Sequence, residues 1–295
     1  MPAPSTRPPV GVALATEAAP AVEAVYYTDP LCSWSWGFEP PLRRLRYEFG
    51  RTLGWRTRMT GLIPSWDRFS DPVNAVSRPL QMGPVCVEVR HRTGQPLDDR
   101  VWVEKPPASS YPACLAVKAA GLQSAAAAEA VLRRLREALF LERRDVSDPA
   151  VLRALARSVA DARPDLLDFS RFSTDLAGPE AEAAFRDDLR EARYLGLTRT
   201  PALTLRCVDG AAEGADDGQG RTLLLVGYRP YAVLRRALAH LAPGLEPARR
   251  ATDVGAYAAF WGGATEREVA EALDAFGSHN KPRTERATPS CSDAA

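Results

Sequence analysis

The chain has 295 residues, of which 45% are hydrophobic and 25% are charged, and its formal net charge is +1. These values are typical of a soluble globular protein with one large or two ordinary domains. They exclude the strongly charged surface by which proteins bind nucleic acid or an anionic membrane, and we expect neither a signal peptide nor a transmembrane helix.

The first sixty residues predict a strand, a helix and a second strand. Residues 1–20 are rich in Pro, Ala, Ser and Thr without periodicity, so we expect them to be disordered. The apolar, aromatic run at 22–27 predicts a buried strand, and apolar residues recur at helical spacing over 42–49. Alternating polarity over 53–59 predicts the second strand. This order implies a parallel pair of strands joined by a right-handed crossover.

Helices dominate the middle of the chain, after a region that prolines interrupt. Seven prolines lie between residues 61 and 109, where we expect irregular structure with one short helix near 84–91. The segment 112–121 predicts a helix of small residues. Further helices are predicted to begin at the Asp148-Pro149 pair and at Pro179, because these residues are typical of helix starts.

The segment 125–142 predicts an amphipathic helix. One face carries four apolar side chains, those of Val131, Leu132, Leu135 and Leu139. The other face carries four charged side chains, those of Arg133, Arg134, Arg136 and Glu137. This division is typical of a helix with one side on the core and the other in water.

The C-terminal part of the chain predicts the rest of a sheet and a short extension. Alternating residues predict a strand at 202–207, and the apolar run at 223–226 predicts its hairpin partner. The pattern at 231–241 predicts a closing helix. A capping box from Thr265 to Glu268 opens one more helix.

These elements predict one main domain with additions. We expect the domain at 21–246, with a helical insertion at about 61–195. A helical extension at 247–276 and a disordered tail at 277–295 complete the predicted organisation.

Cys32 is the strongest candidate for a functional side chain, because it lies where the first strand gives way to a helix. A thiol in the first turn of a helix faces unpaired backbone N–H groups and the positive end of the helix dipole, and both favour the thiolate. We therefore expect a reactive nucleophile with a pKa below the roughly 8.5 of a free thiol.

The other four cysteines do not predict chemistry. They are scattered without paired spacing, which indicates neither a disulfide framework nor a zinc site and favours a reducing, cytoplasmic setting. Cys86, Cys114 and Cys207 lie in apolar or small-residue segments and are expected to be inert, and Cys291 lies in the tail. The three histidines are isolated, so we predict no metal site.

Four segments, in order, resemble the thioredoxin-like superfamily in its DsbA, FrnE and kappa-class glutathione transferase branch. The first is the Cys32-Ser33-Trp34-Ser35 turn, and the second is residues 196–205, which are similar to the family's G-x-x-x-T-P turn. Residues 139–149 and 227–231 match as well. The opening before Cys32 and residues 110–120 are most similar to the YjbH-type members, bacterial adaptors that present a regulator to a protease.

The resemblance implies a fold and a set of site residues. The fold is α/β, a thioredoxin-like core of mixed sheet flanked by helices, with a large helical insertion and a small C-terminal helical extension. Cys32 and Ser35 would be the catalytic pair. Pro201 would follow a cis peptide bond and face the cysteine, Thr200 would bind an extended substrate, and Trp34 would face solvent and a ligand.

Ser35 occupies the place of the second thiol, so an internal disulfide cannot form within this turn. Its hydroxyl is expected to donate a hydrogen bond to the Cys32 thiolate. A single thiol can still form a mixed disulfide with glutathione or with a protein and be released by an external thiol.

Three functions follow from this resemblance. The first is a DsbA-like thiol-disulfide oxidoreductase that works as a monothiol through Cys32 on a protein or glutathione mixed disulfide. The second is a non-catalytic adaptor of the YjbH type, and the third is a kappa-class-like glutathione transferase or isomerase. The expected partner is a protein client or regulated protein; no cofactor is predicted, with glutathione as an alternative co-substrate.

Overall fold

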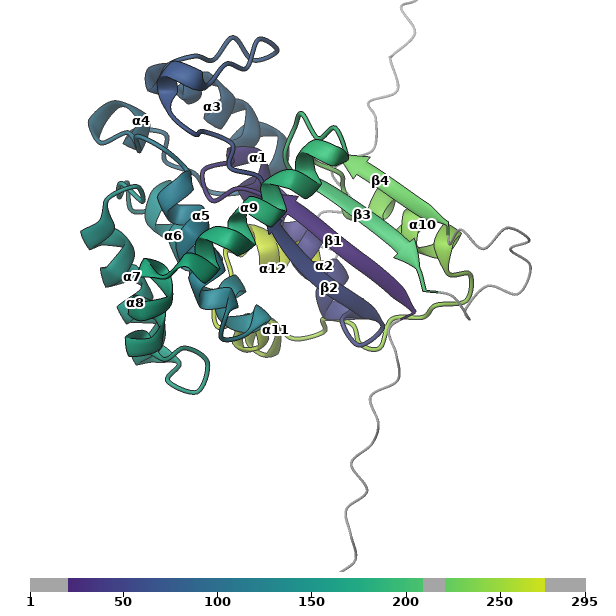
Figure 1. Ribbon diagram of the computed structural model, residues 1–295. Coiled ribbons are helices and arrows are strands. Elements are labelled where there is room, and N and C mark those ends of the chain that lie inside the picture. Colours follow the sequence, from purple (N-terminus) through teal and green to yellow (C-terminus); the bar gives the residue numbers. More distant parts are fainter. Residues whose placement is uncertain (1–20, 209–220, 274–295) are drawn as a thin grey trace, which may run out of the picture.

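The computed structural model describes residues 21–208 and 221–273, and within them four strands form one mixed sheet (Figure 1). The strands are β1 (Val22–Thr28), β2 (Leu53–Met59), β3 (Ala202–Cys207) and β4 (Thr222–Val226). Their order is β2-β1-β3-β4; β1 and β2 are parallel, and the other neighbours are antiparallel. The predicted parallel pair and the antiparallel pairing of the last two strands are confirmed. The disorder predicted for 1–20 and 277–295 lies outside the described residues.

One face of the sheet is covered by α2 (Glu39–Phe49) and α10 (Tyr231–Leu241), which lie behind it in Figure 1. Alternation along β1 directs Val22, Ala24 and Tyr26 to this face, where they join one hydrophobic cluster with residues of both helices. The opposite face is crossed by α9 (Pro179–Tyr194), in front of the sheet in the same view. The arrangement is a thioredoxin-like core of mixed sheet between helices.

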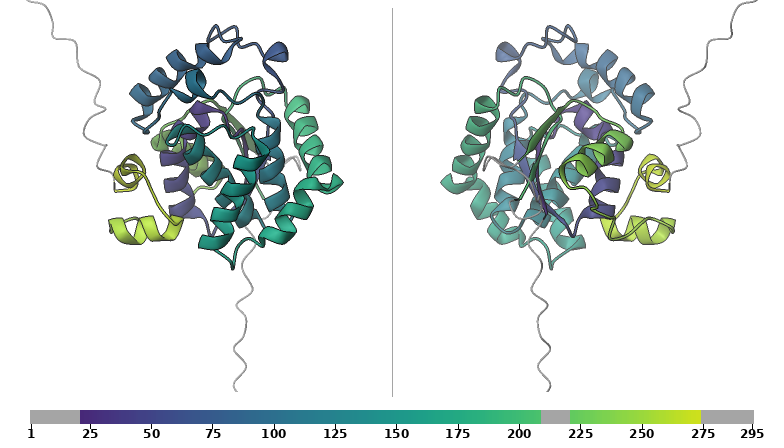
Figure 2. Two further views of the ribbon diagram at one scale, coloured as in Figure 1. Left: turned by 90° about the vertical axis from the view of Figure 1, so that its left-hand side faces the viewer. Right: turned by 90° about the vertical axis from the view of Figure 1, so that its right-hand side faces the viewer.

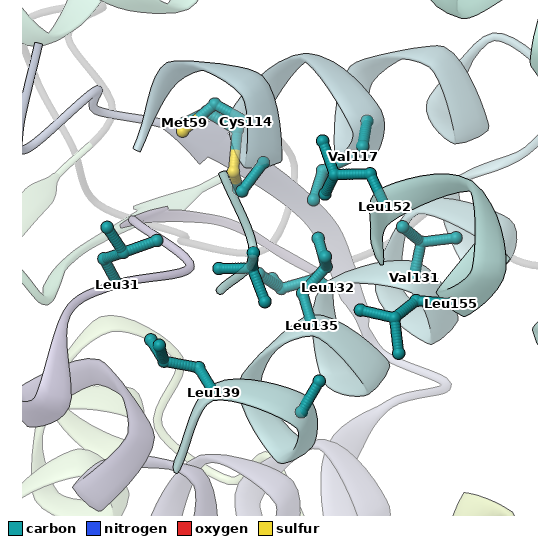
Figure 3. Packing of buried hydrophobic residues seen from close by; sticks show 14 of the residues in the cluster. Leu31, Met59, Cys114, Val117, Val131, Leu132, Leu135, Leu139, Leu152 and Leu155 are labelled. Atoms are coloured by element: carbon teal, nitrogen blue, oxygen red, sulfur yellow. The ribbon is translucent and has the colours of Figure 1, made fainter. Parts of the chain in front are cut away.

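The large helical insertion lies beside the sheet and has its own hydrophobic core (Figures 1 and 2). Its helices are α3 (Met82–Thr93), α4 (Val101–Glu104), α5 (Tyr111–Gly121), α6 (Ala125–Phe140), α7 (Pro149–Ala162), α8 (Phe169–Ala177) and α9. Figure 3 shows Leu31, from the turn before Cys32, in one cluster with Leu132, Leu135 and Leu139 of α6. The insertion therefore packs directly against the segment that carries the cysteine.

Residues 61–109 are more ordered than the prolines predict. The short helix expected near 84–91 is a twelve-residue helix, α3, and α4 and two 3₁₀ turns (Trp66–Arg68 and Pro79–Gln81) accompany it. Pro84 lies in the first turn of α3, where a backbone N–H has no partner within the helix, so it does not interrupt the helix. Gly94, with φ of 73°, ends the helix in the left-handed conformation that glycine adopts readily.

The prediction that Arg136 lies on the polar, solvent-facing side of α6 is wrong. The residue was expected on the polar face of the helix, but it is fully buried, whereas Arg134 remains partly exposed. The reason is that α6 has protein on two sides, since its leucines face the insertion core and Arg136 points toward the end of β1. A simple division into one apolar and one polar face therefore fails for this helix.

The C-terminal extension contains α11 (Val254–Trp261) and α12 (Glu266–Ala272), and its predicted capping box is confirmed. Glu268, the acidic residue of that box, is fully buried and forms ion pairs with Arg43 of α2 and Arg133 of α6. The extension is thus anchored to both the core and the insertion. Within the described ranges, none of the helices combines the length and apolar character needed to cross a membrane.

Candidate functional site

Cys32 lies at the junction between β1 and the short helix α1 (Ser33–Gly37), as predicted from the sequence. It is the N-cap residue of α1, and its Sγ accepts a hydrogen bond from the backbone N–H of Ser35 at 3.3 Å. The sulfur therefore occupies the position that a capping oxygen takes in other helices.

Thr200 faces Cys32 from the segment before β3. Its hydroxyl donates a hydrogen bond to Cys32 Sγ at 3.1 Å, and its carbonyl oxygen lies 3.6 Å from the same sulfur. The Thr200–Pro201 peptide bond is cis, the geometry that the resemblance implies. The fold thus brings together three of the residues that the sequence singles out: Cys32, Thr200 and Pro201.

The predicted low pKa of Cys32 is wrong for this state of the protein. Burial raises the pKa of the thiol, since only 5% of the residue is exposed and little water reaches the sulfur. The hydrogen bonds from Ser35 and Thr200 lower the pKa, and the buried Asp29 carboxylate raises it, but burial is the largest effect. Helix position alone therefore does not make this cysteine a thiolate.

Ser35 also differs from the prediction. The group that donates to Cys32 Sγ in hydrogen-bond geometry is the backbone N–H of Ser35. The Ser35 hydroxyl is buried and has no hydrogen-bond partner within the described residues, although it is near enough to the thiol to lower its pKa. Ser35 thus occupies the place of a second thiol, and its hydroxyl cannot form a disulfide with Cys32.

The two tryptophans of the turn have different surroundings. Trp36 is fully buried, and its indole N–H donates to the carbonyl oxygen of Pro96 at 2.7 Å, so it is a core residue as predicted. Trp34 is half-buried; its ring lies 6.5 Å from that of Tyr228, and the guanidinium of Arg92 lies 5.5 Å from its centre. Trp34 therefore offers an aromatic surface next to the cysteine. Tyr228 was identified from the sequence only as part of the 227–231 segment, and no pattern in the sequence indicated Arg92.

Asp29 is a buried acid three residues before Cys32, in the opening that resembles the YjbH-type members, and the sequence assigned it no role. Its carboxylate accepts hydrogen bonds from the backbone N–H groups of Leu31 and Leu62, at 2.8 and 2.7 Å, and from the Cys114 thiol at 3.4 Å. Burial raises the pKa of Asp29, and these hydrogen bonds oppose that effect. Asp29 therefore joins the cysteine turn to the chain after β2 and to α5.

Arg136 lies behind the same turn and is the second residue that the sequence did not reveal. Its guanidinium donates hydrogen bonds to the Glu39 carboxylate and to the Thr28 hydroxyl. Glu39 also pairs with Arg43 at 3.4 Å. A helical pattern that places Arg136 among exposed charges gives no signal of this role, because the signal lies only in the tertiary packing.

The remaining described cysteines are buried, as their apolar segments predict. Burial raises the pKa of Cys86 to about 12. Burial also raises the pKa of Cys114 well above its ordinary value, and the facing Asp29 carboxylate adds to the effect. Cys207 is buried at the end of β3, and Cys291 lies outside the described residues.

A family model described as thioredoxin matches residues 26–235 of the chain. Among curated proteins, the ClpXP adapter protein SpxH of Halalkalibacterium halodurans is 28% identical over 229 residues, which are 78% of this chain and 70% of that protein. SpxH of Shouchella clausii is 30% identical over 190 residues, 63% of this chain and 59% of that protein. The chain thus spans well under the full length of these relatives.

Two solved structures show the same fold. A protein disulfide isomerase candidate from Nitrosomonas europaea is 24% identical, with a TM-score of 0.57, over 74% of this chain and 96% of that one. The cytosolic disulfide reductase DsbM from Pseudomonas aeruginosa is 22% identical, with a TM-score of 0.54, over 74% of this chain and 99% of that one. At such identities the likeness concerns the fold alone.

Proposed function

The chain belongs to the thioredoxin family, and from this premise we propose that it is a protein adaptor that presents a client protein to a protease of the ClpXP type. The similarity to ClpXP adapter proteins supports this function. This was the second of the three functions expected from the sequence, and it now takes precedence over the first. The adaptor would act in the cytoplasm.

The observation that carries the proposal is the state of the cysteine turn. A two-cysteine oxidoreductase needs an exposed, ionised thiol and a second thiol to resolve the mixed disulfide. Here the Cys32 thiol is 5% exposed and its pKa is raised by burial, while the second position is Ser35. The turn keeps the architecture of a thiol site but favours binding over turnover.

The test measures whether the chain delivers a client protein to ClpXP for degradation, since binding of the client alone does not show adaptor function. A client is first retained from an extract of the source organism on the immobilised chain and identified by mass spectrometry. Purified ClpXP then degrades the purified client with and without the chain. We expect degradation at least tenfold faster with the chain present; an unchanged rate would reject the adaptor function, even if the client binds.

Monothiol exchange through Cys32 is a second candidate, and one observation favours it. The sulfur accepts hydrogen bonds from the Ser35 backbone N–H and the Thr200 hydroxyl, so a thiolate formed there would have two donors in place. The test is reduction of a glutathione mixed disulfide on a model peptide, with added reduced glutathione as the external thiol that regenerates Cys32, compared between the wild type and Cys32→Ala. Turnover that disappears in Cys32→Ala would support exchange, and equal rates would reject it.

A further inference from the structure

The strand β2 forms one edge of the sheet and has backbone groups without a partner. Along a strand, the N–H and C=O of each residue point to the same side, and the side alternates from residue to residue. The Thr52 carbonyl and the Thr60 N–H both bond to β1, whereas the Met59 N–H donates outward to Asp188. The backbone groups of the intervening odd-numbered residues therefore point away from β1.

Trp55 and Thr57 are the two such residues in the middle of the strand. No hydrogen bond joins their backbone N–H and C=O groups to another described residue on the outer side, and both residues are only half-buried. Four hydrogen-bonding groups are thus presented in a row at an accessible edge. An edge of this kind is a template for an added strand.

This edge lies in a cleft between the sheet and the insertion, whose helices stand beyond β2 in Figure 1. A cavity of about 570 Å³ lies on the α2 side of the strand, and one of about 230 Å³ lies toward α5 and α9. Both are lined by Trp55, Thr57, Glu129 and Leu132, so they adjoin along the edge. The cleft is therefore open on both sides of the unpaired backbone.

The charged groups around the cleft favour an acidic occupant. Arginine and lysine outnumber glutamate among the lining residues of both cavities. Several of these cations already pair with carboxylates, such as Arg58 and Lys118 with Asp188. Arg51 and Arg249, however, make no ion pair with another described residue, although the Arg249 guanidinium lies over an aromatic ring at 4.7 Å. Arg56 pairs with Glu23 at 3.4 Å, but 57% of its side chain remains exposed.

From these features we propose that the outer edge of β2 binds an extended, acidic peptide segment of a partner protein by strand addition. The backbone groups of Trp55 and Thr57 supply the hydrogen bonds, and alternate side chains of the segment enter the two cavities. The proposal rests on the proposed adaptor function for its biological role, since the partner would be the client, but not for the binding itself.

The test uses a defined probe, the fluorescein-labelled peptide Glu-Val-Glu-Val-Glu-Val, and measures fluorescence anisotropy with the full chain. A Lys-Val repeat of equal length is the charge control. We expect the glutamate peptide to bind at least tenfold more tightly than the lysine peptide, and its affinity to fall as salt is added. Equal affinity for the two peptides would overturn the acidic specificity.

The backbone part of the proposal is tested by Thr57→Pro with Thr57→Val as its matched control. Both remove the Thr57 hydroxyl, but only proline removes the outward N–H, and edge strands tolerate proline where the N–H faces outward. We expect at least a tenfold loss of affinity in Thr57→Pro and less than a twofold change in Thr57→Val. Equal affinities in the two variants would overturn strand addition.

A version of the glutamate peptide with alternate amides N-methylated gives the same test on the wild-type chain, in case Thr57→Pro does not fold. It should bind at least tenfold more weakly than the unmodified peptide, and equal binding would reject strand addition.

The ClpXP degradation assay separates the two proposals. Peptide binding without accelerated degradation rejects the adaptor function alone, and accelerated degradation without peptide binding rejects the edge site alone.

Discussion

The Thr200 hydroxyl donates a hydrogen bond to the Cys32 sulfur at 3.1 Å, across 168 residues of sequence. The contact joins the cysteine turn to the segment before β3 and opposes the effect of burial on the thiol. It also means that the reactivity of Cys32 depends on a residue that lies far from it in the chain.

Replacing Thr200 with valine should make Cys32 less reactive. Valine keeps the shape of threonine but cannot donate the hydrogen bond that lowers the pKa of the thiol. We expect the wild-type pKa to lie above its ordinary value, and the Thr200→Val pKa to lie higher still. The measurement is the rate of iodoacetamide alkylation as a function of pH; a wild-type midpoint below that of a free thiol would contradict the dominance of burial.

Arg136 should be essential for stability although it carries a charge. Arg136→Met removes a fully buried guanidinium that pairs with Glu39, and removing one member of a buried pair costs about 3–5 kcal/mol. The matched control is Arg134→Met on the same helix, whose partly exposed pair with Glu142 should be worth at most about 1 kcal/mol. Urea unfolding measures the free energy of unfolding of both variants. Equal decreases would show that the buried Arg136–Glu39 pair stabilises the fold no more than the exposed pair does.

Glu268 should hold the C-terminal extension in a pH-dependent way. Burial opposes ionisation, but the Arg43 and Arg133 guanidinium groups outweigh it and place the pKa of Glu268 below its ordinary value of 4.5. Because the folded-state pKa is the lower one, the stabilisation is present above the ordinary pKa and is lost as the pH falls through the folded value.

Glu268→Gln should therefore cost about 3 kcal/mol at pH 7, since two buried arginines lose their shared partner. The difference from wild type should shrink below pH 4.5. Glu266→Gln, at an exposed position in the same helix, is the control and should change stability by less than about 0.5 kcal/mol. A Glu268→Gln deficit that stays constant down to pH 3 would contradict the ionic role of Glu268.

Leu135 tests the core of the insertion (Figure 3). The side chain is 1% exposed within the cluster that also contains Leu31, so Leu135→Ala should cost about 2–5 kcal/mol. Leu141, which follows the same helix and is 40% exposed, gives the control: Leu141→Ala should cost well under 1 kcal/mol. Thermal and urea unfolding report the difference, and similar losses at the two positions would contradict the packing described.

Local patterns predicted the parts of the fold that depend on short stretches of chain. The apolar run before Cys32 and the alternation over 53–59 predicted β1 and β2, and the Thr265–Glu268 capping box predicted the start of α12. The position of Thr200 opposite Cys32 followed from the family resemblance, because no local pattern relates residues so far apart.

The rest depended on tertiary environment. Arg136 has the spacing of an exposed charge, and only the packing of α6 on two sides shows that it is buried. The pKa of Cys32 was predicted from its place at a helix start, but the residues packed around the turn limit how much water reaches the sulfur. This burial raises the pKa. The free edge of β2 likewise appears only when the strand order is known, since any strand can lie in the middle of a sheet.

The most direct test of the adaptor function compares Cys32→Ala with the wild type in ClpXP degradation of the identified client. If binding alone carries the function, the rate of degradation with Cys32→Ala should lie within twofold of the wild-type rate, and both should be at least tenfold above the rate without the chain. A Cys32→Ala rate that falls to the level without the chain would contradict this account and make thiol exchange the essential step.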